Sequence, residues 1–157
     1  MEPNLGALQA LPLKEVAAGN VIIEEGSKVD ALYFLENGMV EVLKGDTQVA
    51  TERERGAVFG EMSLLLQSEA TATVRTLRDS TFHIADDAWK FLDAHPEITV
   101  YVATTLARRL QAVTQYLADV KHQFPEKAGH LGMVDEILDV LMHRQPRRVE
   151  RSPDRGH

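Results

Sequence analysis

The chain has 157 residues, of which 44% are hydrophobic and 26% charged, which is typical of one globular domain with a sizeable core. It contains no cysteine, which excludes disulfides, iron–sulfur clusters and cysteine zinc sites. No apolar run approaches the roughly 20 residues of a membrane span, and the N-terminus lacks the pattern of a signal peptide. We therefore expect a cytoplasmic protein that makes no membrane contact.

The formal net charge is −7, although residues 144–157 contain five arginines against two acids. The rest of the chain is therefore strongly acidic and lacks the clustered Lys and Arg that phosphate contacts to nucleic acid require. We expect 144–157 to be a basic, disordered tail, with an arginine docking site as the alternative.

The first half of the chain is divided by glycines into short runs rich in β-branched and aromatic residues. These runs predict strands at 21–23, 32–35, 39–43, 48–51, 73–76 and 80–84. Between two of them, Lys44-Gly45-Asp46 predicts a tight hairpin, because glycine tolerates positive φ. Short strands at this spacing favour an antiparallel sandwich or barrel.

The second half is predicted to be helical. Asp86 precedes a short helix at 87–94, which His95-Pro96 ends, and a long helix follows at 96–122. Apolar residues recur along the long helix at alternating spacings of three and four, namely Ala103, Leu106, Leu110, Val113, Leu117 and Val120. This heptad seam predicts a two-helix dimer interface, and packing on the β-domain is the alternative. Phe124-Pro125 then breaks the helix before a shorter one at 126–143.

Two segments resemble a known family. GNVIIEEGSKVDALYFLENG (Gly19 to Gly38) has three glycines flanking an apolar run, and FGEMSLLLQSEATATV (Phe59 to Val74) joins a glycine turn and a carboxylate to a helical turn and a strand. They resemble the two signatures of the cyclic-nucleotide-binding β-roll domain of bacterial catabolite-activator and Fnr-type regulators, protein kinase A regulatory subunits and gated channels. The second segment resembles that family's phosphate-binding cassette.

The resemblance implies a mainly β fold with a C-terminal α part: an antiparallel β-roll (jelly roll), a long dimerisation-type helix and one further short helix. The motif LARRLQ (Leu106 to Gln111) is similar to the dimer helix of the bacterial regulators. We accordingly expect residues 1–122 to form the roll with its helices, 123–143 an extra helix and 144–157 the tail. Too few residues follow His122 for the helix-turn-helix of those regulators, so direct DNA binding is not expected.

The resemblance also implies a ligand site. In the family, the position of Glu61 accepts a hydrogen bond from the ribose 2′-hydroxyl, and that of Thr71 faces the cyclic phosphate. Arg109 resembles a residue that reaches the ribose-side carboxylate. The residues that we assign to ligand binding are Gly60, Glu61, Met62, Ser63, Ala70, Thr71, Ala72, Arg109, Val113 and Thr114. Read alone, Glu61 could be a helix-start carboxylate and Arg109 a solvated helix residue.

Ala70 departs from the family pattern, which places an arginine there to grip the phosphate in a fork geometry. Losing such a partner should weaken binding by about 2–5 kcal/mol, and the neighbouring Glu69 adds unfavourable negative charge. Arg75 is a candidate substitute, but we expect it to be an ordinary strand residue.

These observations predict a small-ligand-sensing regulatory module that binds cyclic AMP or cyclic GMP weakly, or another small molecule. The alternative is a degenerate, ligand-free roll that serves as a dimerisation or protein-interaction module. We expect a homodimer through helix 96–122 and an unidentified downstream protein partner. We expect no catalytic residues, no metal and no certain cofactor, because no nucleophile elbow, Walker-type loop or His–carboxylate metal motif is present.

Overall fold

The computed structural model describes residues 5–123 and 128–143. A 3-10 helix at Gly6–Ala10 precedes eight strands, and three of the four α-helices follow the last strand. The strands are β1 Leu13–Val16, β2 Val21–Ile23, β3 Leu32–Asn37, β4 Val40–Lys44, β5 Thr47–Glu52, β6 Val58–Phe59, β7 Thr73–Thr76 and β8 Ser80–Ala85. The helices are α1 Glu61–Leu66, α2 Ala88–Ala94, α3 Pro96–Gln123 and α4 Ala128–His143.

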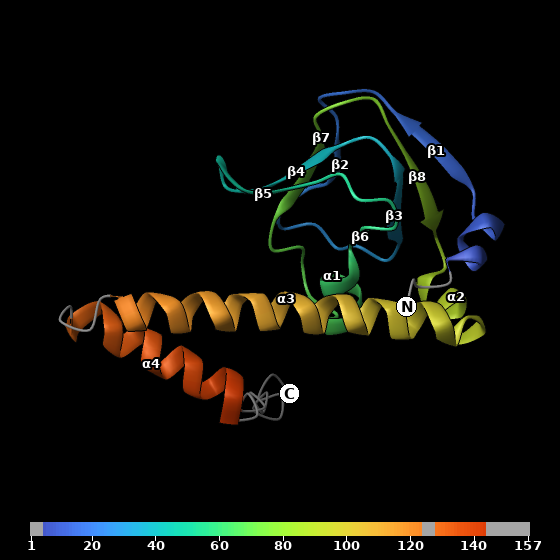
Figure 1. Cartoon of the computed structure of the whole chain (residues 1–157). Coiled ribbons are helices and arrows are strands. Elements are labelled where there is room, and N and C mark those ends of the chain that lie inside the picture. The colour runs from blue at the N-terminus through green and yellow to red at the C-terminus, as the bar shows by residue number, and fades with distance from the viewer. Residues whose placement is uncertain (1–4, 124–127, 144–157) are drawn as a thin grey trace, which may run out of the picture. The chain divides into compact units, whose positions relative to one another are not determined.

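The strands form two antiparallel four-stranded sheets, ordered β1-β8-β3-β6 and β2-β7-β4-β5. The two sheets face one another in Figure 1 and enclose the core of a β-roll. Most of these pairings join strands that are distant in the sequence, but β4 and β5 are consecutive and pair across a tight turn at Gly45, whose φ is +60°. This hairpin confirms the turn that the sequence predicted at Lys44-Gly45-Asp46.

The interior of the roll is apolar and drawn from both sheets. Phe34 and Phe82 of one sheet and Val40 of the other are fully buried. Because strand side chains alternate between faces, Val40 and Val42 point into this interior while Glu41, between them, points out. The same alternation along β7 determines which of its side chains face the interior of the roll.

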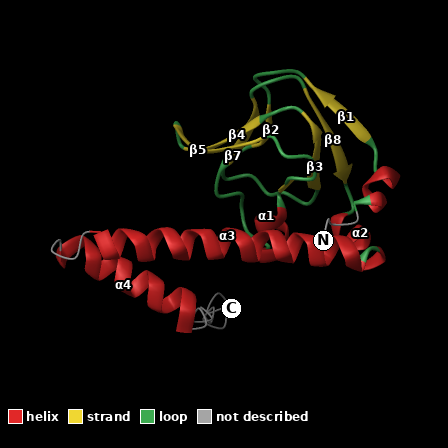
Figure 2. Cartoon of the chain, viewed as in Figure 1, coloured by secondary structure: helices red, strands yellow, loops and turns green. Residues whose placement is uncertain are grey.

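Helices α2 and α3 begin and end within one residue of the predicted bounds. Asp87 caps α2 by accepting a hydrogen bond from the Lys90 N–H at 3.4 Å, and Pro96 opens α3. Figure 2 shows the helices in red and the strands in yellow; along the chain, α1 lies between β6 and β7, and α2, α3 and α4 follow β8. Among the described helices none is long and apolar enough to cross a membrane.

The described residues divide into two compact units, one running to Ala103 and the other starting at Thr104, so the division falls within α3. The first unit contains the roll, α1, α2 and the start of α3, whose Ile98 and Val102 are buried. In the second unit, the rest of α3 and α4 are joined by an ion pair between Lys121 and Asp135.

The fold class predicted from the sequence is confirmed. All six predicted strands are present, with ends that differ from the predicted ones by at most two residues, and so are the helices at 87–94 and 96–122. The sequence did not predict β1 and β6. The expected helix at 126–143 is present from Ala128, whereas residues 124–127 and the predicted tail at 144–157 lie outside the described residues.

Candidate functional site

The cassette, residues 59–74, starts with a glycine that the fold itself requires. Gly60 has φ +93° between β6 and α1, a conformation that side chains rarely adopt. A Cβ at this position would lie 2.7 Å from the Ala31 carbonyl oxygen. Gly60 is among the residues that the sequence assigned to ligand binding, and its close approach in the structure is to the chain's own backbone.

Helix α1 buries two polar side chains together with Leu64, and it exposes the other apolar side chains. Glu61 is 5% exposed and Ser63 is equally well buried, whereas Met62 is 46% exposed. The Ser63 hydroxyl donates to the Ser68 carbonyl and accepts a 3.3 Å hydrogen bond from the Val29 N–H. Ser63 therefore holds the loop after α1 in place, and Glu61 is the buried carboxylate of the cassette.

Ala70 is fixed by its backbone and points into the roll. Its N–H donates to the Ser27 carbonyl at 2.7 Å, and its carbonyl accepts from the Gly26 N–H at 2.8 Å. Its side chain packs against the apolar core cluster that includes Val40 and Val74. A longer side chain at position 70 would thus begin on the inner side of the roll.

Thr71 and Ala72 continue the cassette toward β7. Thr71 is exposed and Ala72 half-buried. The Thr71 carbonyl accepts a 2.6 Å hydrogen bond from Lys44 Nζ, at the end of β4. Sequence reasoning missed Lys44, because it assigned this residue to the hairpin turn and not to the strand.

Arg75 is held on the outer side of the roll. It faces Glu41 across the β4–β7 ladder, and its Nη2 lies 3.0 Å from Glu41 Oε1. The neighbouring Val74 points inward to the core, so Arg75 points away from it. This geometry agrees with the expectation that Arg75 is an ordinary strand residue and does not replace the missing arginine.

Three of the assigned site residues, Arg109, Val113 and Thr114, lie on the part of α3 that belongs to the second unit. Val113 is 51% exposed, and the Thr114 hydroxyl donates to the carbonyl of Leu110 within the helix. Their approach to the cassette stays a prediction from the family resemblance.

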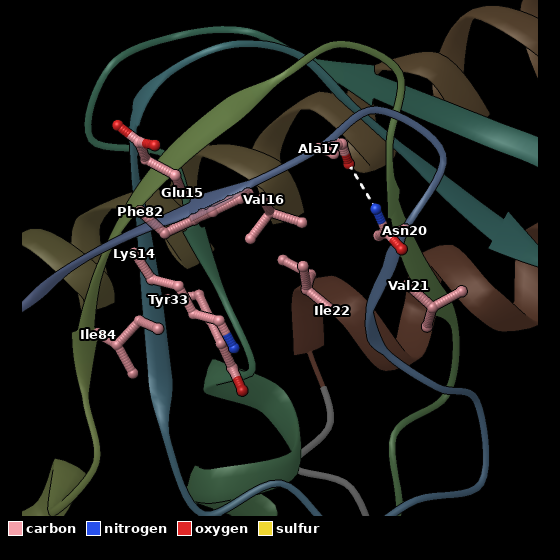
Figure 3. Close-up of a pocket in the computed structure, with 10 residues that line it drawn as sticks. All are labelled: Lys14, Glu15, Val16, Ala17, Asn20, Val21, Ile22, Tyr33, Phe82 and Ile84. Atoms are coloured by element: carbon pink, nitrogen blue, oxygen red, sulfur yellow. Dashed lines mark hydrogen bonds between the residues drawn. The ribbon is translucent and has the colours of Figure 1, made fainter.

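A cavity of about 370 Å³ opens elsewhere in the roll, between β1 and β2. Figure 3 shows side chains of both sheets gathered around it, among them Val16, Ile22 and Tyr33. Burial, and secondarily the charge of Asp86, raise the pKa of Tyr33. The Asn20 side-chain amide at the rim donates to the Ala17 carbonyl at 2.9 Å. None of the assigned ligand residues lines this cavity.

A charged cluster lies on the sheet β1-β8-β3-β6. His83 is 2% exposed, and its Nε2 lies 2.8 Å from Glu36 Oε2, while Arg55 Nε lies 3.0 Å from Glu36 Oε1. The hydrogen bond with His83 lowers the pKa of Glu36; burial opposes this shift, and Arg55 supports it. Among the described residues, no three His, Cys, Asp or Glu side chains group to hold a metal ion.

Comparison with known proteins identifies the family. Residues 13–87 match the family model described as the cyclic nucleotide-binding domain. A solved structure of the Thermus thermophilus catabolite activator protein has a TM-score of 0.63 and 26% identity, covering 73% of this chain and 57% of that one. Residues 13–87 are therefore a domain of the cyclic nucleotide-binding family, which is a regulatory and not a catalytic family.

Two curated relatives have a similar sequence identity to this chain. The cAMP-dependent protein kinase regulatory subunit of Mucor circinelloides f. lusitanicus is 34% identical over 85 residues, which cover 54% of this chain and 20% of the relative. Lysophospholipase nte1 of Aspergillus oryzae is 28% identical over 134 residues, which cover 82% of this chain and 8% of the relative. The chain thus spans a fifth or less of the length of these two relatives.

Proposed function

We propose that the chain is a small-ligand-sensing regulatory module whose cassette binds cyclic AMP or cyclic GMP weakly, or another small anionic molecule. The observation that carries this proposal is Glu61, a carboxylate only 5% exposed in a cassette whose turn geometry is intact around Gly60. Burying a carboxylate is costly, so its retention favours a role in recognition. In the proposed complex the Glu61 carboxylate accepts a hydrogen bond from the ribose 2′-hydroxyl, and Thr71 faces the phosphate.

We propose a low affinity because position 70 lacks the arginine that would contact the ligand phosphate. Ala70 supplies no charge, and Arg75 is engaged with Glu41 on the outer face. The ligand would therefore depend on Glu61, on Thr71 and on apolar contacts inside the roll.

Regulation would follow from a change in helix packing. We place Arg109, Val113 and Thr114 of α3 near the bound ligand, so that binding shifts the equilibrium between two arrangements of the dimer helices. A homodimer through α3, a cytoplasmic location and an unidentified downstream protein complete the proposal. The lysophospholipase activity in a relative's name is not assigned to this chain.

Calorimetry with cyclic AMP and cyclic GMP at near-millimolar concentration tests the proposal. We expect saturable binding to the wild type, and a loss of roughly tenfold in affinity for Glu61→Gln. 2′-Deoxy cyclic AMP should bind the wild type more weakly than cyclic AMP does, by a similar factor. Glu61→Gln should bind the two nucleotides equally well, because the substitution and the missing hydroxyl remove the same hydrogen bond. The absence of heat with either nucleotide at that concentration would exclude a nucleotide sensor.

The second candidate is a ligand-free roll that acts as a dimerisation module. It is favoured by the packing of Ala70 against the core cluster and by the exposure of Leu110 and Val113 on the seam of α3. It predicts a dimer whose stability does not respond to any nucleotide. Thermal unfolding with and without ligand separates the two candidates, since only a ligand that binds the folded state raises the melting temperature.

A further inference from the structure

We propose that Lys44 provides the cationic contact for the anionic group of the ligand, in place of the arginine that Ala70 has replaced. This inference rests on the proposed function of the cassette. It starts from one contact, the 2.6 Å hydrogen bond from Lys44 Nζ to the carbonyl of Thr71, which is the residue after Ala70.

Lys44 is the last residue of β4 and is exposed, on the strand face that alternation assigns to Val40 and Val42. β4 pairs regularly with β7 from Val40 to Leu43, and the register shift in this hairpin falls in the pairing with β5. Alternation along β4 therefore continues without interruption, so Lys44 shares the face of Val40 and Val42. Its Nζ reaches the Thr71 carbonyl, so the ammonium group lies beside the residue that follows Ala70.

An ammonium at this point retains donors for an anion. A lysine carries three N–H donors, and the Thr71 carbonyl accepts one of them. Unlike a guanidinium, the ammonium acts as a point charge and does not form a planar fork. The contact should therefore be weaker and less selective for phosphate geometry than an arginine contact.

The surrounding charges limit the strength of this site. The Glu25 carboxylate accepts a 3.0 Å hydrogen bond from the N–H of Gly45, next to Lys44. Glu69 precedes Ala70 and pairs through its backbone with Lys28. In this acidic environment a cation directed at the cassette offsets negative charge that would otherwise repel an anionic ligand.

Calorimetry with cyclic AMP on four proteins tests the proposal. Lys44→Met removes the charge but keeps most of the side chain, Lys44→Arg keeps the charge, and Lys90→Met removes an exposed lysine on α2, away from the cassette. We expect Lys44→Met to bind cyclic AMP roughly 5- to 30-fold more weakly than the wild type. Lys44→Arg and Lys90→Met should bind within about twofold of the wild type. The melting temperature of each variant establishes that it is folded.

The outcomes separate this inference from the proposed function. If the wild type binds and Lys44→Met binds equally well, the role of Lys44 is wrong and the nucleotide-sensing proposal stands. If the folded wild type shows no binding of cyclic AMP, both are wrong for this ligand. A second readout is salt: the affinity of the wild type should fall more steeply with ionic strength than that of Lys44→Met.

Discussion

Arg75 and Glu41 face one another across the outer surface of the β-roll, with Arg75 Nη2 3.0 Å from Glu41 Oε1. The Glu41 side chain is 8% exposed and the Arg75 side chain 42% exposed. The arginine therefore serves to pair a nearly buried carboxylate, and its direction removes it from the interior where a ligand would lie. Arg75 therefore does not replace the arginine that is missing at position 70.

Arg75→Met should lower the free energy of unfolding by about 1–3 kcal/mol, because it leaves the Glu41 carboxylate without its charged partner. The same variant should bind cyclic AMP as the wild type does. Urea denaturation measures the first effect and calorimetry the second. Arg78→Met, which changes an exposed arginine of the following loop, is the matched control. A loss of nucleotide affinity in folded Arg75→Met would show that Arg75 does reach the ligand.

Gly60→Ala should lower the free energy of unfolding by about 1–3 kcal/mol, because alanine is strained at φ +93° and its Cβ would meet the Ala31 carbonyl. Gly19→Ala is the matched control. Gly19 has φ +84° but no atom within 4 Å of the Cβ position, so only the backbone strain of about 1 kcal/mol remains. Equal destabilisation of the two variants in urea would mean that the close approach at Gly60 costs nothing.

The sequence predicted the fold because its signals are local. Glycine turns, alternating strands and the His95-Pro96 boundary each depend on neighbouring residues, and the structure confirms them. β1 was missed because Leu13–Val16 has two charged residues and lies mostly exposed at a sheet edge. β6 was missed because two residues are too few to show a pattern.

Less of the candidate site could be predicted from the sequence, because the site depends on contacts between distant segments. The family pattern located Glu61 and Ala70, but no local signal places Lys44 beside Thr71, which is 27 residues further along the chain. The pairing of Arg75 with Glu41 likewise requires the register of β4 and β7. The ligand contacts of Arg109, Val113 and Thr114 stay predictions.

Glu36 should make the stability of the protein depend on acid pH. Its pKa in the folded protein lies below the ordinary value of 4.5, chiefly because of the hydrogen bond with His83. A lowered pKa stabilises the folded state above about pH 4.5, and this stabilisation is lost as the pH falls through the folded pKa. The difference in unfolding free energy between the wild type and Glu36→Gln should therefore shrink below pH 4.5.

Urea midpoints of the two proteins at several pH values between 3 and 7 measure this difference (about three pH points on each side of 4.5 suffice). Glu97→Gln provides a control, since it changes a half-exposed carboxylate paired with His95 at the start of α3. A difference between wild type and Glu36→Gln that stays constant across the range would contradict the assignment.

Leu110→Glu should dissociate the proposed dimer, because it places a charge on the apolar seam of α3. Leu110 is 47% exposed and the neighbouring Val113 51% exposed in the single chain, so both are available to a second copy. Gln111→Glu adds the same charge on an exposed face beside the seam. Sedimentation velocity should show a dimer for the wild type and Gln111→Glu, and a monomer for Leu110→Glu. A monomeric wild type at all concentrations would exclude this interface.

The most direct test of the account is the affinity of Ala70→Arg for cyclic AMP, compared with that of the wild type by calorimetry. Ala94→Arg, which adds the same charge at the exposed end of α2, is the control. If the cassette is intact and lacks only its phosphate arginine, Ala70→Arg should have an affinity for cyclic AMP that is higher than that of the wild type by about 30-fold or more. A folded Ala70→Arg protein with no gain in affinity would contradict the account, because the cassette would then differ from its family in more than this one residue.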